Sequence, residues 1–319
     1  VLKDSVKFES ETTFPLSSEA GERVVQFNAI PEFNELNELE TILFVAHEIT
    51  EQKLIQLEIE KKNKSITESI NYAKRIQTAI LPTEDIIKNY LPKSFLFYHP
   101  RDVVSGDIPW IYVQDEIVYI AAIDCTGHGV PGALLSFISY FLINNIVTTK
   151  GKEINAGEIL NMLHFDVRKT LKQDTPDAEA RDGMDIALCK IDLKKNHLDF
   201  SGAHRPLYVL KNNGEFVQYK GTLKAIGGIP LKNKVEKKFI NYSIEYELND
   251  KIFFFSDGIA EQIGGEDGNK FKNNGIKDVI MNNAKASIHE FSGIFEKEFN
   301  NWKGDYKQID DVLLLGIEF

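Results

Sequence analysis

Hydrophobic and polar positions alternate in two short runs near the start of the chain, at residues 23–27 and 41–45, with Pro31 and polar residues between them. Alternation with a period of two predicts half-buried β-strands. Residues 51–81 read differently, because glycine and proline are absent and Glu, Lys, Gln, Ile and Leu dominate. This composition predicts one long helix, which Pro82 should end because the residue before a proline avoids the α region.

The predicted helix carries an apolar stripe. If Gln52 takes a heptad a position, the a and d positions are Gln52, Ile55, Ile59, Lys62, Ile66, Ser69, Ala73, Ile76 and Ile80. Six of these nine residues are apolar, which is the pattern of a coiled-coil seam with polar interruptions. The sequence therefore predicts a homodimer through residues 51–81. The alternative is a single helix that packs on its own domain.

Residues 85–319 mix strand and helix patterns. Short apolar runs predict strands at residues 118–123, 184–191, 197–201, 207–211, 238–242, 252–255 and 312–319. Longer periodic segments predict helices at residues 132–145, 155–172, 275–283 and 288–300. Tight turns such as Asn212-Asn213-Gly214 join successive strands and favour antiparallel pairing. Because strands and helices are segregated along the chain, the predicted fold class is α+β.

Composition and charge narrow the possible functions. The 319 residues carry a formal net charge of −11, and 43% of them are hydrophobic. A chain of this length forms one large domain or two. The acidic balance argues against nucleic-acid binding, which needs a basic face, and gives no support to binding an anionic membrane. The longest apolar stretch, residues 134–147, contains two serines and two asparagines, so we expect no membrane span there.

The cysteines and methionines suggest where the segment belongs. Cys125 and Cys189 form no spaced pattern, which fits a reducing cytoplasm and predicts neither a disulfide framework nor a zinc site. The chain begins at Val1 and its first methionine is Met162, as is typical of a fragment of a longer protein. A missing front end could hold a sensor or a membrane anchor.

Four aspartates stand beside strand-like runs or glycines. They are Asp107 in a Ser-Gly-Asp triplet, Asp124 in Asp-Cys-Thr-Gly-His-Gly, Asp257 in Ser-Asp-Gly and Asp310 in Ile-Asp-Asp-Val. Carboxylates at strand ends, beside glycines that allow close approach, suit a hard divalent cation. Any one of these motifs alone reads as a turn. The four together favour a metal site formed by a fold that brings them together.

Residues 101–319 resemble the SpoIIE-like branch of the PPM-type, metal-dependent serine/threonine protein phosphatases. The matching stretches come in family order at residues 101–107, 121–133, 182–188, 201–208, 255–258 and 308–312. The resemblance implies two stacked antiparallel β-sheets flanked by helices. It also implies hydrolysis of phosphoserine or phosphothreonine by a water activated by two Mn²⁺ or Mg²⁺ ions, with a phosphorylated regulatory protein of the anti-anti-sigma type as substrate.

The family pattern assigns roles to the candidate ligands. Asp124 would bridge both ions, and the backbone carbonyl of Cys125 would ligate one of them. Asp257 and Asp310 would hold the first ion, and Asp107 would hold the second directly or through water. The neighbouring Asp311 would point away or orient a neighbour.

Other polar residues near these motifs allow two interpretations each. Arg101 could bind substrate phosphate, since guanidinium matches phosphate geometry, or it could be a surface arginine. His128 could donate a proton to the leaving oxygen, although a hydrogen bond within its loop is favoured. His204 is interpreted as part of a turn at the rim of the site. Asp182 and Asp185 could serve a third, weak ion, but the start of a strand is favoured.

One departure from the family pattern keeps a second function open. The family usually places two aromatics after Ser-Gly-Asp, whereas this chain has Ile108-Pro109 before Trp110. Proline cannot donate to a sheet ladder, so the local strand is in question. The alternative function is a catalytically weakened, phosphatase-like scaffold that binds a phosphoprotein partner without hydrolysing it.

The sequence predicts three parts in all. Residues 1–50 form a partial sensor segment, because residues 44–53 resemble the last strand and exit of a PAS domain. Residues 51–84 form a helical coiled-coil linker, and residues 85–319 form the phosphatase domain. The front half that would complete a PAS ligand pocket is absent, so no cofactor is expected in residues 1–50. An ordinary β-hairpin is the alternative there.

Overall fold

The computed structural model describes residues 8–15, 22–36, 38–175, 178, 181–230 and 236–319. The chain divides into two compact units, Val1–Ser69 and Ile70–Phe319. Helix α1 (Thr50–Ile80) contributes to both units. Each unit is described by itself below.

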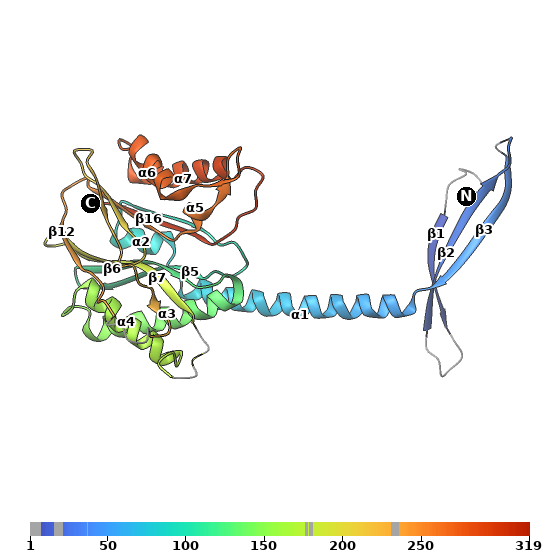
Figure 1. Cartoon of the computed structure of the whole chain (residues 1–319), viewed down its shortest axis with the longest axis horizontal. Coiled ribbons are helices and arrows are strands. Elements are labelled where there is room, and N and C mark those ends of the chain that lie inside the picture. Colours follow the sequence, from blue (N-terminus) through green and yellow to red (C-terminus); the bar gives the residue numbers. More distant parts are fainter. Residues whose placement is uncertain (1–7, 16–21, 37, 176–177, 179–180, 231–235) are drawn as a thin grey trace. The chain divides into compact units, whose positions relative to one another are not determined.

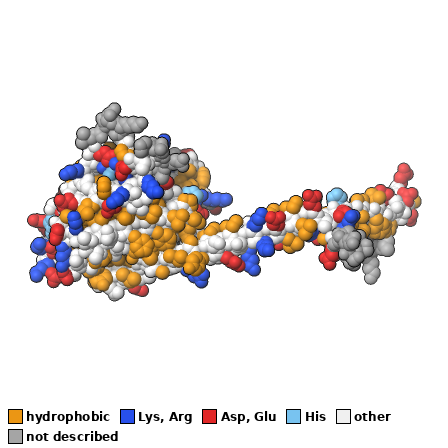
Figure 2. Space-filling view, turned by 90° about the horizontal axis from the view of Figure 1, so that it is seen from below, with side chains coloured by type: hydrophobic (Ala, Val, Ile, Leu, Met, Phe, Trp, Pro, Cys, Tyr) orange, Lys and Arg blue, Asp and Glu red, His pale blue; other side chains and the backbone are white. Residues whose placement is uncertain are grey.

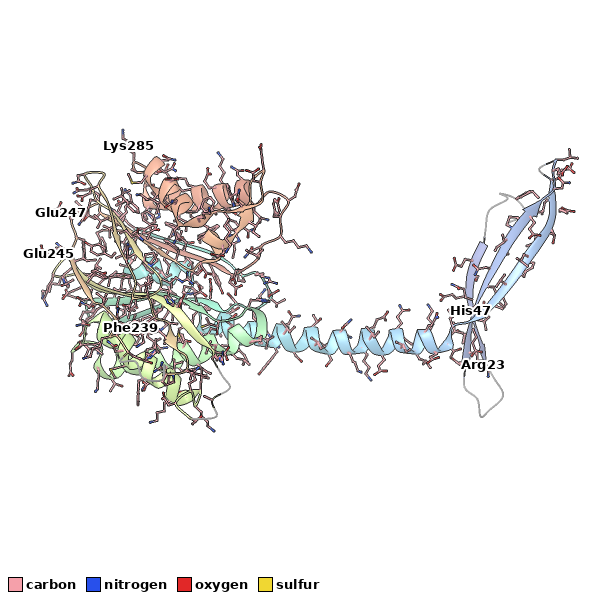
Figure 3. The ribbon with its side chains drawn as sticks, in the orientation of Figure 1. Arg23, His47, Phe239, Glu245, Glu247 and Lys285 are labelled. Carbon is pink, nitrogen blue, oxygen red and sulfur yellow. The ribbon has the colours of Figure 1, made fainter. Side chains whose placement is uncertain are left out.

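The first unit contains a three-stranded antiparallel sheet in the order β1-β2-β3. Its strands are β1 (Phe8–Pro15), β2 (Glu22–Phe33) and β3 (Leu39–Glu48). The two predicted runs lie within β2 and β3, and Figure 3 labels Arg23 and His47 on these strands. The sheet is thus larger than the simple hairpin considered from the sequence, while its relation to PAS domains stays a prediction.

Helix α1 is the helix predicted for residues 51–81, and it ends one residue before Leu81-Pro82. Hydrophobic side chains are visible along it, mixed with charged ones (Figure 2). Four isoleucines of the predicted seam, Ile55, Ile59, Ile66 and Ile76, are between 44% and 56% exposed. An apolar stripe this exposed is unfavourable in water unless another surface covers it.

The second unit is built on two stacked antiparallel sheets with helices on the outer faces (Figure 1). The five-stranded sheet has the order β10-β9-β13-β16-β4, and the six-stranded sheet has the order β12-β8-β7-β6-β5. The strands of the first sheet are β10 (Phe216–Tyr219), β9 (Leu207–Leu210), β13 (Lys251–Phe255), β16 (Val312–Glu318) and β4 (Ser94–His99). Those of the second are β12 (Tyr242–Glu245), β8 (His197–Ala203), β7 (Gly183–Asp192), β6 (Ile117–Cys125) and β5 (Asp107–Gln114). This architecture confirms the predicted α+β fold class.

Short elements complete the second unit. Helix α2 (Glu84–Tyr90) follows α1, and the two-residue strand β11 (Ile226–Gly227) pairs with β7. The one-turn helix α5 (Gly258–Glu261) begins right after Asp257. Strands β14 (Ile263–Gly264) and β15 (Asn269–Lys270) form a small separate pair.

Three hydrophobic layers hold the second unit together. Residues between the two sheets form the central layer, which includes Ile120, Phe200 and Phe254. Helices α3 (Gly129–Lys150) and α4 (Ala156–Thr170) cover the outer face of the six-stranded sheet. Helices α6 (Lys272–Asn282) and α7 (Ile288–Lys303) cover the five-stranded sheet.

The sequence of strand β6 is an unbroken apolar run because both faces of the strand are buried. Val118, Ile120 and Ala122 belong to the layer between the sheets, whereas Ala121 and Ile123 belong to the layer beneath α3 and α4. Successive side chains of a strand point to opposite faces, and here both faces are buried. Asp124 shares the parity of Ala122, so its carboxylate points toward the space between the two sheets.

The strand predicted for residues 238–242 is wrong. Strand β12 begins only at Tyr242 and runs to Glu245. The preceding residues are held by side-chain bonds instead of a ladder, since the Ile240 N–H donates to Thr222 Oγ1 at 3.0 Å and the Phe239 N–H donates to Asn161 Oδ1 at 3.2 Å. The buried ring of Phe239 gave this segment its strand-like pattern.

Helix α3 is longer than the apolar stretch suggested. By length and composition alone, its 22 residues could cross a membrane. In the fold, Ile143, Ile146 and Val147 are buried against the six-stranded sheet and α4. A core helix passes the same compositional test, and α3 packs as one.

Pro109 does not interrupt β5. The strand pairs continuously with β6 from Asp107↔Asp124 to Gln114↔Ile117, with Pro109 opposite Ala122. Strand β5 lies at the edge of its sheet, where a missing N–H donor is tolerated. The concern that Ile108-Pro109 breaks the local strand is therefore wrong.

Candidate metal centre

Three aspartates form a row across the six-stranded sheet. Asp107 is paired with Asp124 in the β5–β6 register, and Asp124 is paired with Asp185 in the β6–β7 register. Residues directly opposite one another on neighbouring strands share a face. The parity of Ala122 in β6 and of Ala187 in β7, both in the layer between the sheets, puts this row on the inner face.

The other sheet brings Asp257 and Asp310 to the same place. Asp257 follows β13 and Asp310 precedes β16, and these two strands are antiparallel neighbours. The Asp257 N–H donates to Asp124 Oδ2 at 3.4 Å across the gap between the sheets. Together with Asp185, these residues line a pocket of about 240 Å³.

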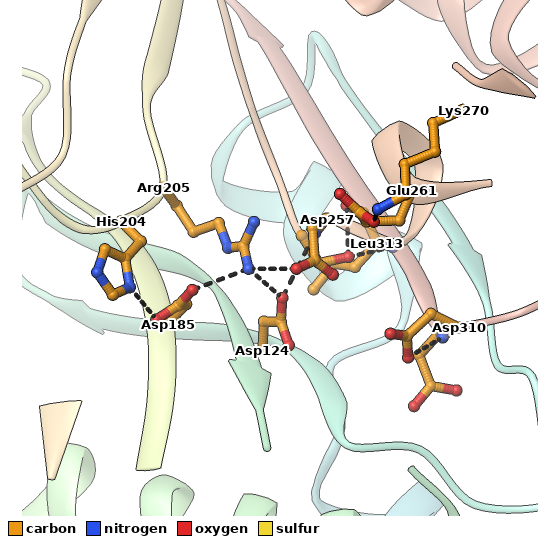
Figure 4. Close-up of polar contacts among 11 residues, drawn as sticks. Asp124, Asp185, His204, Arg205, Asp257, Glu261, Lys270, Asp310 and Leu313 are labelled. Carbon is orange, nitrogen blue, oxygen red and sulfur yellow. Dashed lines mark hydrogen bonds and ion pairs between the residues drawn. The ribbon is translucent and has the colours of Figure 1, made fainter. Parts of the chain in front are cut away.

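An arginine lies within this group of carboxylates (Figure 4). Arg205 Nη2 is 3.0 Å from Asp124 Oδ2, 2.8 Å from Asp185 Oδ2 and 2.7 Å from Asp257 Oδ2. Across the described ranges of the chain, no three His, Cys, Asp or Glu side chains are arranged around a common point as a ready-made ion site. In this structure Asp124, Asp185 and Asp257 converge on the guanidinium instead.

The electrostatics of the pocket favour added positive charge. Burial raises the pKa of Asp107, and the neighbouring Asp124 carboxylate raises it further. Burial also raises the pKa of Asp124 to about 7, although Arg205 opposes the shift. The pKa of Asp310 is raised by burial as well. These carboxylates lie where their negative charge is poorly compensated, which is the setting that a divalent cation stabilises.

The donor set fits Mn²⁺ or Mg²⁺. All the candidate side chains are carboxylates, and hard oxygen ligands select hard cations. Asp107 Oδ2 is buried and lacks a hydrogen-bond partner among the described residues. A buried carboxylate oxygen without a donor calls for a partner, and a cation would supply one.

Asp311 orients a loop and is not placed as a ligand. It is 2% exposed, and its Oδ1 accepts from the Arg101 N–H at 2.7 Å while its Oδ2 accepts from the Gly106 N–H at 2.8 Å. These bonds fix the segment that leads into Asp107. Gly106 must be glycine there, because a Cβ atom would lie 2.5 Å from the Gly127 carbonyl oxygen.

Arg101 is exposed and is bonded to the segment that precedes β16, while a role in phosphate binding stays a prediction. Its Nη1 donates to the Ile309 carbonyl oxygen at 2.8 Å, and its backbone bonds to Asp311. The guanidinium thus ties two loops together. His128 lines the pocket, and its Nδ1 pairs with Asp102 Oδ2 at 2.9 Å, in the segment that precedes Asp107, while its role stays a prediction.

Cys125 directs its side chain away from the pocket chemistry. The thiol is buried beneath α3, with Sγ 3.6 Å from Ser139 Oγ. Burial raises the pKa of this thiol far above its usual range. A thiol that stays protonated is a poor nucleophile, so any contribution of Cys125 to the site comes through its backbone.

The sequence interpretation gave Arg205 no role and favoured the start of a strand for Asp185 over a weak ion site. Asp185 does start a strand, as favoured, but it also lies in the carboxylate group. The β6–β7 register, which the sequence does not specify, sets Asp185 opposite Asp124. His204, interpreted as part of a turn, bonds Asp185 through its Nδ1 at 2.8 Å and has a left-handed φ of 56°.

A larger groove adjoins the pocket. It has a volume of about 800 Å³ and shares Ala225 with the smaller pocket. Its lining includes four basic side chains, Arg168, Lys220, Lys224 and Lys237, together with Leu223, which is 91% exposed. The only acidic side chain among its described lining residues is Glu236, which pairs with Arg168, Lys224 and His164.

Comparison with known proteins identifies the family. The family model described as Stage II sporulation protein E (SpoIIE) matches residues 114–319. No curated protein sequence matches the chain. Among solved structures, the PP2C domain of SiaA from Pseudomonas aeruginosa is similar at 28% identity with a TM-score of 0.71, over 81% of this chain and 98% of that chain.

Two further structures share the fold. One contains the PP2C phosphatase domain and a fragment of the regulatory domain of SpoIIE from Bacillus subtilis, with 14% identity and a TM-score of 0.57 over 100% of this chain and 81% of that chain. The other contains the RsbU and RsbW domains of Rv1364c from Mycobacterium tuberculosis, with 14% identity and a TM-score of 0.55 over 72% of this chain and 60% of that chain. Since the family model covers well over half of the residues, this chain belongs to the SpoIIE family of PPM-type phosphatase domains.

Proposed function

We propose that the unit Ile70–Phe319 is a metal-dependent phosphatase that hydrolyses phosphoserine or phosphothreonine on a regulatory protein. The observation that carries the proposal is the convergence of Asp124, Asp257 and Asp310 from two sheets around one pocket of about 240 Å³, with Asp107 opposite Asp124 on the neighbouring strand. Membership of the SpoIIE family supports the same reaction class.

The candidate ligands are those assigned by the family pattern. Asp124 would bridge two ions, Asp257 and Asp310 would hold one, and Asp107 would hold the other, with the Cys125 carbonyl as a further ligand. When bound, Mn²⁺ or Mg²⁺ would lower the pKa of a water molecule and neutralise charge on the phosphoryl oxygens. The number of ions is part of the proposal.

The protein's own residues would organise the site. Asp311 holds the Gly106 N–H and so fixes the approach to Asp107. The pairing of His128 with Asp102 holds the loop that begins α3. Preorganised groups of this kind raise catalytic efficiency because less reorganisation is needed during reaction.

The basic groove is our candidate for contact with the protein substrate. Lys220 and Lys237 are exposed there, next to the carboxylate pocket. The net charge of the chain is −11, so a local concentration of lysines is informative about partners. An acidic segment around a phosphoserine would complement this surface. A small phosphorylated regulatory protein of the anti-anti-sigma type is the proposed substrate.

Two further features belong to the proposal. The exposed isoleucine stripe of α1 supports a homodimer through a coiled coil. Both described cysteines are free and buried, in keeping with a cytoplasmic setting. The alternative of an inactive scaffold rested on Pro109, and β5 accommodates that residue at the sheet edge.

One assay tests the proposal directly. Purified protein should hydrolyse p-nitrophenyl phosphate and a phosphoserine peptide with Mn²⁺ or Mg²⁺, and EDTA should remove the activity. Retention of activity in EDTA would exclude the metal-dependent mechanism. If the protein binds the phosphopeptide with Mn²⁺ present but releases no phosphate, the scaffold function would replace the phosphatase.

A further inference from the structure

Arg205 is the central cation of the carboxylate pocket. A single nitrogen, Nη2, lies within 3.0 Å of carboxylate oxygens from Asp124, Asp185 and Asp257. Charge-assisted bonds of this kind are shorter and stronger than neutral ones. These three oxygens come from β6, from β7 and from the end of β13, so the guanidinium joins the two sheets at the pocket.

The backbone directs Arg205 into this position. The turn before it is tight, since the Arg205 N–H donates to the Ala203 carbonyl oxygen at 2.6 Å and His204 is left-handed. A Cβ atom at Gly202 would lie only 2.0 Å from the Arg205 carbonyl oxygen. The turn therefore fixes where the side chain starts, while its long stem can still take other rotamers.

The side chain is not fully satisfied where it lies. Arg205 Nε is buried and has no hydrogen-bond partner among the described residues. Burial lowers the pKa of Arg205, but Asp124, Asp257 and Asp185 raise it more, so the group stays charged. The ionic contacts of Nη2 therefore stabilise this position of the side chain, whereas the buried Nε–H without an acceptor destabilises it.

A divalent cation and this guanidinium cannot share these oxygens. Both are positive, and Arg205 Nη2 already contacts Asp124 Oδ2 and Asp257 Oδ2, so an ion bound to the same carboxylates would repel the guanidinium. A divalent ion bound to these carboxylates would leave the guanidinium facing a second positive charge at close range. Loading the site would therefore expel Arg205 Nη2 from its position among the three carboxylates.

A displaced Arg205 guanidinium could bind the phosphoryl oxygens of a substrate at this pocket. Arg205 is the only lysine or arginine among the described residues that line the pocket. Its planar fork matches phosphoryl oxygens in a bidentate manner. Arg101 already donates to the Ile309 carbonyl oxygen, and Arg168 of the adjoining groove pairs with Glu236.

We propose that Arg205 is an exchangeable counter-ion: it occupies the carboxylate site while metal is absent, is displaced by the ions, and then binds the phosphoryl group of the substrate. This inference rests on the proposed phosphatase function. It assigns Arg205 two roles of opposite effect, since the residue opposes metal binding and favours phosphate binding. A purely structural ion pair would favour metal binding instead, by keeping the three carboxylates in place.

The first test is calorimetric titration of the metal-free full chain with Mn²⁺. We expect Arg205→Ala to bind Mn²⁺ at least about tenfold more tightly than wild type, because no internal cation competes. Arg205→Lys, which keeps the charge but loses the fork, should lie between the two. Arg75→Ala is the control, because it removes the same charge from α1, where Arg75 stacks over Tyr72. Unchanged or weaker Mn²⁺ binding by both Arg205 variants would overturn the proposal.

The second test uses inorganic phosphate as the probe of the Mn²⁺-loaded protein. We expect phosphate binding about tenfold weaker or worse in both Arg205→Ala and Arg205→Lys, with no change in Arg75→Ala. Thermal unfolding should show a lower melting temperature for metal-free Arg205→Ala, with the deficit shrinking at saturating Mn²⁺. Wild-type phosphate affinity in both Arg205 variants would remove the second role.

The two proposals fail in different ways. If wild-type protein binds Mn²⁺ and hydrolyses p-nitrophenyl phosphate while the Arg205 variants behave like wild type in both titrations, only the exchange of Arg205 is wrong. If wild-type protein binds no Mn²⁺ at all, the proposed phosphatase function is wrong, and the role of Arg205 falls with it.

Discussion

Gln77 holds the backbone of Ser105 from two sides. Its Nε2 donates to the Ser105 carbonyl oxygen at 2.7 Å, and its Oε1 accepts from the Ser105 N–H at 3.0 Å. The same Nε2 also donates to Ser136 Oγ on α3 at 3.1 Å. Gln77 is the buried residue of α1. The end of α1 is therefore bonded directly to the segment that leads into Asp107.

We expect Gln77→Ala to lower both stability and metal affinity. The change leaves the buried Ser105 N–H and carbonyl without their partner, which should cost about 2–4 kcal/mol in the free energy of unfolding. Asp107 would lose part of its support, so Mn²⁺ binding should weaken. Urea unfolding and calorimetric titration measure the two effects. Gln56→Ala is the control, because Gln56 is exposed on α1 and bonds only Glu60 among the contacts described. Equal unfolding free energies for Gln77→Ala and wild type would contradict this coupling.

Asp124→Asn and Asp257→Asn should each abolish Mn²⁺-dependent hydrolysis while leaving the fold intact. Each change removes a charged oxygen from the pocket without altering side-chain volume. The rate at saturating substrate should fall about a thousandfold or more. Phosphate release and circular dichroism are the measurements, and Asp278→Asn on the exposed surface of α6 is the control. Turnover like that of wild type in either pocket variant would remove that residue from the metal centre.

Cys125→Ala should retain most activity. The thiol lies in the layer beneath α3, and burial holds its pKa well above neutral pH. The side chain therefore packs, and only the backbone carbonyl remains at the pocket. We expect a loss of stability of about 1 kcal/mol from the smaller side chain, with little change in the rate. Complete inactivation with Mn²⁺ binding preserved would point to a cysteine mechanism instead.

The sequence was sufficient to predict the central parts of the fold and most of the candidate ligands. The apolar run of β6 and the glycine-flanked Asp124 are local signals, and they needed no knowledge of tertiary structure. The convergence of Asp257 with Asp124 depends on the stacking of two sheets. The four motifs together predicted a fold that brings the aspartates together, but the role of each ligand came only from the family resemblance, because spacing along the chain does not show which strand ends meet.

Arg205 and residues 238–242 show where local signals fail. The role of Arg205 depends on three carboxylates from separate strands, and nothing in its immediate sequence marks it. Residues 238–241 look like a strand because Phe239 is apolar, yet Thr222 and Asn161 supply their hydrogen bonds. Tertiary bonding overrides local preference in such segments.

Glu236→Gln should destabilise the protein near neutral pH, and the effect should shrink in acid. Burial raises the pKa of Glu236, but hydrogen bonds from Arg168, His164 and Lys224 lower it by more than burial raises it. The pKa is therefore about 2, below the ordinary value of 4.5. A depressed carboxylate pKa gives stability that is complete above the unfolded pKa and is lost as pH falls toward the folded pKa. The stabilisation should therefore be full above about pH 4.5 and decline between 4.5 and 2.

Urea unfolding at several pH values measures this effect. We expect a deficit of about 1–2 kcal/mol for Glu236→Gln at pH 7, after allowance for partial solvent exposure. Glu58→Gln serves as the control, because the pair of Glu58 with Lys62 is exposed on α1. A deficit that stays constant from pH 7 to pH 3 would show that the charge of Glu236 is not responsible.

The isoleucine stripe of α1 should mediate a homodimer. Ile55, Ile59 and Ile66 are each at least half exposed within this chain, and a second copy of the helix is the simplest surface to cover them. Lys62 and Ser69 interrupt the seam, so two registers of the coiled coil could have similar energies. The dimer would then be a switchable element connecting the first unit to the phosphatase unit.

Sedimentation and kinetics of the full chain test this last prediction. Wild-type protein should be dimeric at micromolar concentration, and Ile66→Glu should shift it toward monomer because a charge in the seam is repelled by its own copy. Thr67→Glu is the control, since it adds the same charge outside the seam. The rate of Ile66→Glu at saturating Mn²⁺ should differ from that of Thr67→Glu if α1 transmits a signal. A monomeric wild type would exclude the dimer, and equal rates for a monomeric Ile66→Glu and a dimeric control would exclude control of activity by the dimer.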